Sequence, residues 1–124
     1  MIGAGRVGKN HSRSIVHHVP GGEIVALVDP MEQVRKETAI EFGIEKQYDT
    51  LELALEKADF EAVIITTPTP THLPLTTLAA ENKKHVFLEK PMALNLQECD
   101  AILKVVEQNA VLLQLGFMRR FDPE

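Results

Sequence analysis

Short, nearly continuous apolar runs alternate with segments of helical spacing along this chain, and this alternation constrains its fold most. The runs cover residues 24–28, 62–65, 86–88 and 111–115. Strands with helices on both faces are typically continuous apolar runs rather than alternating ones. Each intervening segment carries one apolar stripe, at positions 31, 34, 38 and 42, at 51, 54, 55 and 58, and at 99, 102, 103, 106 and 110. The sequence therefore predicts the α/β class, with a doubly wound parallel sheet.

Capping residues mark two helix starts. Asp29 is followed by Pro30 and Glu32, which places a cap, a first-turn proline and an acid in the order that opens a helix. Asn95 and Glu98 repeat the cap-and-acid arrangement. We therefore expect helices that begin directly after Asp29 and after Asn95.

Composition excludes several classes of function. The 124 residues fit one domain, and the formal net charge of -5 argues against nucleic-acid binding, which needs a basic face. The apolar runs are too short to cross a bilayer, no signal peptide is visible, and the single Cys99 forms no internal disulfide. No histidine pair has the i, i+4 spacing of a zinc helix. We expect a cytoplasmic protein without a metal site and without nucleic-acid or membrane partners.

A glycine-rich turn, Gly3-Ala4-Gly5-Arg6-Val7-Gly8, precedes the first predicted helix. The first glycine permits a tight turn, the second lets the backbone approach a pyrophosphate, and the third lets the helix pack closely on a strand. The anion would lie on free amides at the positive end of that helix. The glycine spacing alone is weak evidence for nucleotide binding, because glycine-rich turns are common. It predicts that the cofactor-binding residues of this turn are Gly3, Gly5, Arg6, Val7 and Gly8.

Asp29 follows Gly8 by 21 residues, at the end of the next predicted strand. A carboxylate there can accept both hydroxyls of the adenosine ribose, and it repels the 2′-phosphate of NADP. We therefore expect NAD as the cofactor and weaker binding of NADP, although Arg35 in the following helix could offset part of the repulsion. The helix-cap role of Asp29 is compatible with ribose binding.

A turn of this kind normally follows a whole strand, and here only Met1 and Ile2 precede Gly3. That strand is central in the usual 3-2-1-4-5-6 order. We therefore expect a dinucleotide-binding domain, residues 1–124, that is truncated at its N-terminus with the first strand largely missing.

Further motifs follow in order along the chain: Thr66-Thr67-Pro68, Thr71-His72, Glu89-Lys90-Pro91 and Gly116-Phe117-Met118-Arg119-Arg120-Phe121-Asp122-Pro123. Together with the glycine turn, this series resembles the Gfo/Idh/MocA oxidoreductases over almost the whole chain. The last motif is most similar to the inositol 2-dehydrogenase branch. The resemblance implies a Rossmann domain of a dehydrogenase that transfers hydride between NAD and a CH–OH group of a cyclic polyol or sugar.

The resemblance also implies cofactor contacts from the loop of residues 66–68 and from His72 on the turn after it. Without the resemblance, the Thr-Pro sequence would end a strand, and Thr69 or Thr71 would cap the next helix. His72 would then be an ordinary surface histidine. Both interpretations stay open at this stage.

The resemblance places Glu89 and Lys90 at the cofactor and assigns Lys90 to the reacting centre, often with a cis bond before Pro91. Alcohol oxidation removes a proton from oxygen as hydride leaves carbon, and an ordinary lysine, with a pKa of about 10.4, is a poor base at neutral pH. Lys90 therefore fits an orienting donor and proton relay. The alternative is a surface lysine paired with Glu89.

The main base is expected to be a histidine, accompanied by an aspartate, in a C-terminal substrate domain that is absent from residues 1–124. Met118 and Arg119 would border the substrate pocket, or Arg119 and Arg120 would pair with acids such as Asp122. The full-length protein would form a homo-oligomer through the second domain. This chain alone should bind nucleotide without turnover. The alternatives are a non-catalytic NAD(P)-sensing regulator of the same family and, ranked last, a methyltransferase-like nucleoside-binding sheet.

Overall fold

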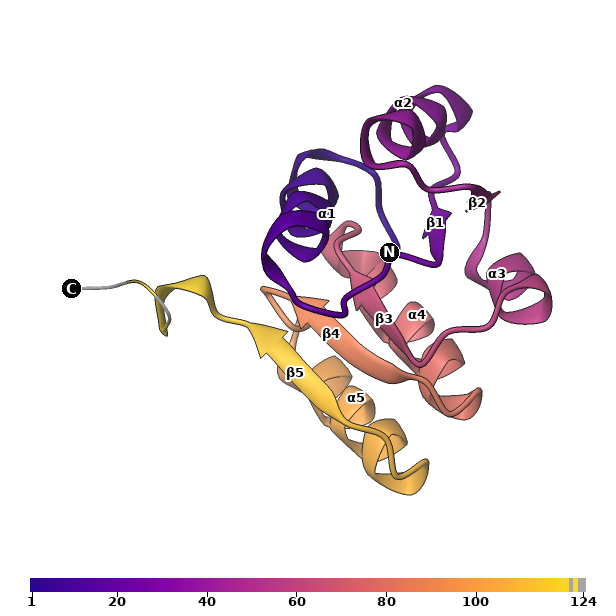
Figure 1. The fold of residues 1–124 in the computed structure, drawn as a ribbon. Helices are drawn as coiled ribbons and strands as arrows, with labels where there is room; N and C mark the ends of the chain where they lie inside the picture. The colour runs from indigo at the N-terminus through magenta and orange to yellow at the C-terminus, as the bar shows by residue number, and fades with distance from the viewer. Residues whose placement is uncertain (121, 123–124) are drawn as a thin grey trace. The chain divides into compact units, whose positions relative to one another are not determined.

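The structure is a computed structural model that describes residues 1–120 and 122. The chain divides into two compact units, Met1–Glu61 and Ala62–Glu124. Each unit contains parallel strands connected by helices (Figure 1). The predicted parallel α/β class is confirmed.

The first unit contains α1 (Arg6–His18), β1 (Ala26–Val28), α2 (Glu32–Phe42), β2 (Lys46–Tyr48) and α3 (Leu51–Lys57). β1 pairs in parallel with β2 on one side. On its other side Ile2 forms one parallel bridge with Val28, and the Gly3 amide donates to the Val28 carbonyl at 2.8 Å. The sheet order expected for the first half of a doubly wound fold is therefore present, with a single bridge in the place of the first strand.

The start of α2 differs from the prediction. Its N-cap is Met31, whose side chain makes no capping bond, so the prediction that Asp29 caps this helix is wrong. Asp29 Oδ1 accepts instead from the Met31 amide at 2.8 Å, and Oδ2 accepts from the Ala4 amide at 2.9 Å. The carboxylate is therefore held between the glycine turn and the residue before α2, because Oδ1 makes the local contact and Oδ2 makes the long-range one.

The second unit contains β3 (Ala62–Ile65), the 3-10 turn η1 (Thr69–Thr71), α4 (His72–Glu81), β4 (His85–Glu89), α5 (Leu96–Gln108), β5 (Leu113–Gly116) and the 3-10 turn η2 (Met118–Arg120). Its strands form a parallel sheet in the order β3-β4-β5. α4 contacts β3 and β4 and lies beside α5, as Figure 1 shows. A core of Ala80, Val106 and Val111 fills the space under these helices.

The predicted cap of α5 is confirmed, because Asn95 Oδ1 accepts from the Glu98 amide at 2.9 Å. The predicted stripe is confirmed at Ile102 and Val106, which are buried. It is wrong at Leu103, whose exposed fraction is 53%, and at Ala110, which lies beyond the helix end with a φ of 54°.

The amino group of Met1 lies inside the first unit and donates to the Ala26 carbonyl at 2.9 Å. Burial lowers the pKa of this amino group from 8.0 to about 5. Within the described part of the chain, no helix has the length and apolar character needed to span a bilayer.

Candidate functional site

The first turn of α1 leaves its amides available to a ligand. Gly5 is the N-cap and provides no side-chain cap, and the first intrahelical bond runs from the Lys9 amide to the Gly5 carbonyl at 2.9 Å. Helix geometry therefore gives the amides of Arg6, Val7 and Gly8 no intrahelical acceptor. The first turn contains no acidic residue. It combines the positive end of the helix dipole with the cationic Arg6, which favours an anion.

Gly3 and Gly5 serve different purposes in this turn. Gly3 has a φ of 101°, which side-chain-bearing residues rarely adopt, so the turn itself requires glycine there. Gly5 is extended, and a Cβ built on it meets no atom within 4 Å. The fold alone does not require glycine at position 5. Open space beside unpaired amides fits a pyrophosphate lying against the backbone, as the sequence predicts.

The amide and the carbonyl of Ala4 are both hydrogen-bonded to side chains from later segments of the first unit. Its amide donates to Asp29 Oδ2 at 2.9 Å, and its carbonyl accepts from Thr38 Oγ1 at 3.1 Å. Both Ala4 and Thr38 are fully buried. Sequence reasoning placed Thr38 on the apolar stripe of α2 and missed its contact with the turn. The available signal was a hydroxyl on a buried stripe, because such a group needs a partner.

Replacing Thr38 with valine is expected to lower the free energy of unfolding by about 1–3 kcal/mol, because the buried Ala4 carbonyl loses its donor. NAD affinity should also fall, since the glycine turn loses one of the two side-chain hydrogen bonds that hold Ala4 in place. Chemical denaturation and titration calorimetry would measure the two effects.

The matched control is Thr76→Val, because Thr76 is also fully buried and its hydroxyl has no hydrogen-bond partner among the described residues. This change should leave stability unchanged or raise it. Equal stability losses in the two variants would contradict the role given to Thr38.

Asp29 lies at the end of β1 and keeps acceptor capacity for a ligand. Each of its carboxylate oxygens accepts one backbone amide, whereas an ionised carboxylate offers about four acceptor positions. Arg35 donates from Nη1 to the Asp29 carbonyl, which brings a cation beside this acid. The predicted ribose-binding residue and the predicted glycine turn are thus in direct contact.

The second group of predicted residues follows β3 and β4 in the second unit. Thr67 Oγ1 and Thr71 Oγ1 share a hydrogen bond of 2.6 Å, and the Thr71 hydroxyl also contacts the Pro68 carbonyl at 2.7 Å. Thr71 occupies the N-cap position of α4 without a side-chain capping bond. The alternative in which Thr71 caps this helix is therefore confirmed for its position, whereas its side chain makes no capping bond. The loop after β3 is closed by its own threonines.

His72 is buried, with an exposed fraction of 1%, so the surface-histidine alternative is wrong. Its ring nitrogens contact backbone carbonyls of the loops after β3 and β4. The Lys90–Pro91 bond is cis, as the resemblance implies, and Lys90 is exposed. The structure brings together the threonine motif, His72 and the segment after Lys90.

Gly116 gives Glu89 the space that its side chain occupies. The two residues face each other in the β4–β5 register, and a Cβ on Gly116 would lie 2.9 Å from Glu89 Oε1. Glu89 Oε2 in turn accepts from the Lys90 amide at 3.2 Å. Sequence reasoning noted Gly116 within a motif and assigned it no role. A side chain at position 116 would have to displace the Glu89 carboxylate and would crowd the Phe87 ring, whose nearest carbon lies 3.1 Å from such a Cβ.

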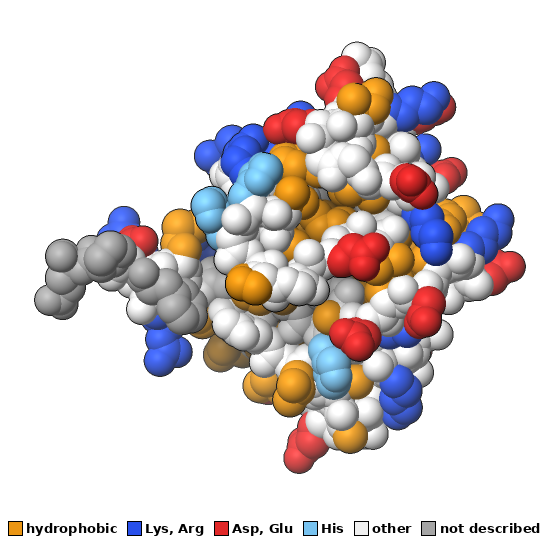
Figure 2. All heavy atoms as spheres, in the orientation of Figure 1, with side chains coloured by type: hydrophobic (Ala, Val, Ile, Leu, Met, Phe, Trp, Pro, Cys, Tyr) orange, Lys and Arg blue, Asp and Glu red, His pale blue; other side chains and the backbone are white. Residues whose placement is uncertain are grey.

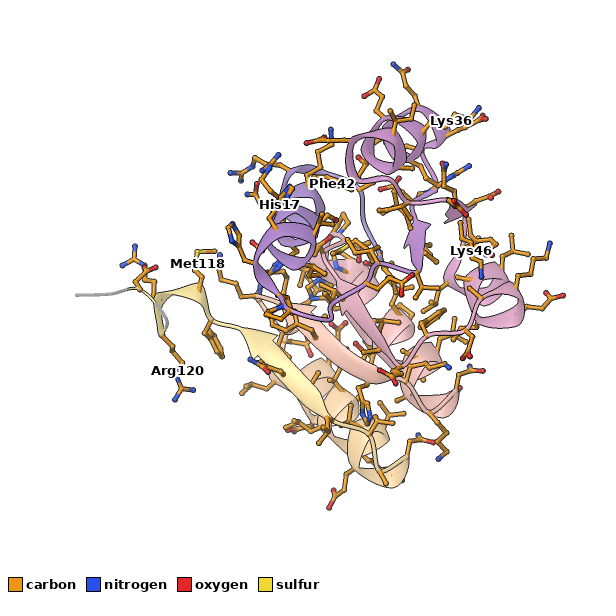
Figure 3. All side chains as sticks on the ribbon, viewed as in Figure 1. His17, Lys36, Phe42, Lys46, Met118 and Arg120 are labelled. Carbon is orange, nitrogen blue, oxygen red and sulfur yellow. The ribbon has the colours of Figure 1, made fainter. Side chains whose placement is uncertain are left out.

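Met118 and Arg119 lie on η2, after β5, and both are exposed. Figure 3 shows Met118 and Arg120 projecting away from this segment. Phe121 and Pro123 of the same motif lie outside the described residues. The substrate role of Met118 and Arg119 stays a prediction.

Possible metal ligands are scattered over residues 1–120 and 122. These residues contain no cluster of three or more His, Cys, Asp or Glu side chains that could hold a metal. A hollow of about 350 Å³ lies over the exposed face of α2, where Lys36 lowers the pKa of Glu32 by a hydrogen bond. On the face shown in Figure 2, basic and acidic side chains are interspersed.

Parallel strands joined by helices, a glycine turn with unpaired amides and a carboxylate at the neighbouring strand end define a dinucleotide-binding domain. A family model described as an oxidoreductase family with an NAD-binding Rossmann fold matches residues 1–117. The chain therefore belongs to this family, the Gfo/Idh/MocA oxidoreductases, and is its NAD-binding domain. The family resemblance seen in the sequence is confirmed.

Several inositol dehydrogenases are similar to this chain. The scyllo-inositol 2-dehydrogenase (NAD(+)) of Bacillus subtilis (strain 168) is 43% identical over 123 residues, covering 99% of this chain and 36% of that protein. The inositol 2-dehydrogenase of Rhizobium meliloti (strain 1021) is 38% identical over 124 residues, covering 99% and 36%. The scyllo-inositol dehydrogenase of Lactobacillus casei, solved with NAD(H) and scyllo-inositol, matches with a TM-score of 0.91 at 33% identity, covering 98% and 36%. This chain thus spans 36% of the length of these relatives.

Proposed function

We propose that this chain is the cofactor-binding part of a dehydrogenase that oxidises a CH–OH group of a cyclic polyol or sugar with NAD. The first turn of α1 carries the proposal, because its amides lack intrahelical acceptors and the space beside Gly5 is open. The similarity to proteins named inositol dehydrogenases supports the substrate class.

The residues of this chain fit the pyrophosphate and the adenosine ribose of NAD. The amides from Gly5 to Gly8 would hold the pyrophosphate, and the free acceptor positions of Asp29 would take the ribose hydroxyls. The negative charge of Asp29 would repel a 2′-phosphate, so NAD is preferred over NADP. Arg35 beside Asp29 reduces this preference without removing it, because its Nη1 is engaged by the Asp29 carbonyl.

Oxidation of an alcohol transfers hydride from carbon and releases the hydroxyl proton. NAD, when bound, supplies the hydride acceptor. Lys90, exposed after the carboxyl end of β4, would donate a hydrogen bond that orients the substrate oxygen. In a relay, its ammonium group would first give a proton to the final base, and the amine so formed would take the hydroxyl proton. The cofactor would also be contacted by residues at or just after the carboxyl ends of β3 and β4, which are Thr66, Thr67, Pro68 and Glu89. Met118 and Arg119 would border the substrate.

A second domain outside residues 1–124 would supply the base that finally takes the proton and most of the substrate pocket. The length of the relatives, of which the chain spans 36%, supports this proposal. We further propose that the full-length protein is cytoplasmic and assembles as a homo-oligomer through that domain. Light scattering on the full-length protein would measure the assembly.

The test is to assay the full-length protein with NAD or NADP against inositol isomers, other cyclic sugars and acyclic polyols. We expect NADH formation with an inositol or cyclic sugar, and slower turnover with NADP. A protein that binds NAD and reduces none of it with any of these alcohols would instead be a non-catalytic NAD(P)-sensing regulator.

A further inference from the structure

His72 connects two loops that follow different strands. Its Nε2 lies 2.9 Å from the Thr67 carbonyl, in the threonine loop (residues 66–68). Its Nδ1 lies 3.0 Å from the Pro91 carbonyl and 3.2 Å from the Met92 carbonyl, in the proline loop (residues 90–92). The ring is buried at the start of α4 and does not reach the surface. It therefore acts on the site through the backbone of both loops.

All of the ring's partners are carbonyl oxygens, which only accept hydrogen bonds. A neutral imidazole carries one N–H and donates to one loop, whereas the doubly protonated ring donates to both. The threonine loop has additional hydrogen bonds of its own, because Thr71 contacts both Thr67 and Pro68. We therefore expect the Nδ1 contact with the proline loop to be the one for which His72 matters most.

We propose that His72 is a positioning residue that holds the proline loop, and Lys90 with it, against the first turn of α4. The proposal rests on the proposed function, since the role of Lys90 belongs to it. Pro91, whose carbonyl faces Nδ1, directly follows Lys90 in the chain. A displacement of about 1 Å at a reacting group costs on the order of 100-fold in rate. Loss of this contact should therefore lower kcat.

The test compares four variants of the full-length protein at saturating NAD and polyol. His72→Leu removes both ring nitrogens. His72→Asn places an amide near the position of Nδ1, and His72→Gln places one near the position of Nε2. Thr76→Val is the control, because it lies one turn further along α4, is fully buried and loses no hydrogen bond among the described residues.

We expect kcat to fall on the order of 100-fold in His72→Leu and to stay within about threefold of the unmodified protein in Thr76→Val. His72→Asn should recover most of the loss and His72→Gln less, because only the asparagine amide reaches the proline loop. A folded His72→Leu with nearly unchanged kcat would overturn the proposal. Equal failure of both amide variants, or better recovery by glutamine, would also overturn it.

A measurement on the unmodified 124-residue chain covers the case in which His72→Leu does not fold. Nuclear magnetic resonance should show a ring N–H proton on Nδ1 of His72 that exchanges slowly with water and lies close to the proline loop. The exposed His17 is the internal control for fast exchange. Fast exchange at His72 would overturn the proposal. If the unmodified full-length protein oxidised no polyol, the proposed function would fail while this measurement still reported on His72.

Discussion

The Lys90→Met variant of the full-length protein is expected to oxidise polyol about 10²–10⁴-fold more slowly than the unmodified enzyme. Methionine keeps an unbranched side chain of similar length and removes the ammonium group that would donate to the substrate oxygen. Lys90 is exposed after the carboxyl end of β4, so the substitution should cost little stability. The dissociation constant for NAD, whose adenosine half is assigned to the glycine turn, should change much less than kcat.

The matched control is Lys104→Met, on the exposed face of α5. It removes the same charge from the same unit and should leave turnover unchanged. Stopped-flow measurement of NADH formation separates the hydride step from product release. A Lys90→Met enzyme whose hydride step stays within a few-fold of the control would show that Lys90 is not at the reacting centre.

The free energy of unfolding of the 124-residue chain, with a free amino group at Met1, is expected to fall by roughly 4 kcal/mol as the pH drops from 8.0 to about 5. Burial lowers the pKa of this amino group, so between those values the unfolded chain binds the proton and the folded chain does not. The contribution of this amino group to stability is therefore greatest above pH 8 and decreases with added acid. Denaturation with urea at several pH values would measure it.

Acetylation of the Met1 amino group provides the control for this effect. The acetylated chain has no titrating group there and keeps an N–H that can donate to the Ala26 carbonyl. Subtracting its stability curve from that of the free chain removes the contribution of the histidines. Parallel curves through this pH range would contradict the position of residues 1–3 beside β1.

The sequence predicts the parallel α/β fold because buried parallel strands require apolar runs, and these runs locate β1, β3, β4 and β5. It misses β2, since the exposed and half-buried residues Lys46, Gln47 and Tyr48 form no apolar run. The ends of the strands also shift, from the expected 24–28 to Ala26–Val28 and from the expected 111–115 to Leu113–Gly116. Hydrogen bonding between strands determines these ends, and a hydropathy pattern does not contain that information.

The candidate site is predictable where residue type alone fixes the local chemistry. The glycine turn is such a case, because a positive φ at Gly3 and free amides after Gly5 follow from the motif. Contacts between distant residues are not predictable in this way. Asp29 Oδ2 accepts from the amide of Ala4, 25 residues away, and Thr38 reaches the Ala4 carbonyl across 34 residues.

His72 shows the same limit in a different form. Its motif allows either a cofactor contact or a surface position, and the structure buries its ring between two loops. Local sequence cannot report which carbonyls converge on an imidazole, because they come from segments after two different strands. Only the three-dimensional structure therefore shows that the His72 ring is buried and which carbonyls it contacts.

The central claim is that the amides at the start of α1 hold the pyrophosphate of NAD. Titrating the isotope-labelled chain with NAD, while following its backbone amide resonances, tests this claim directly. The resonances of Gly5, Arg6, Val7 and Gly8 should shift on binding. In Gly5→Val, whose Cβ would meet no protein atom within 4 Å, folding should persist and these shifts should be lost. A Gly5→Val chain that binds NAD as tightly as the unmodified chain, or shifts confined to other amides, would contradict the account.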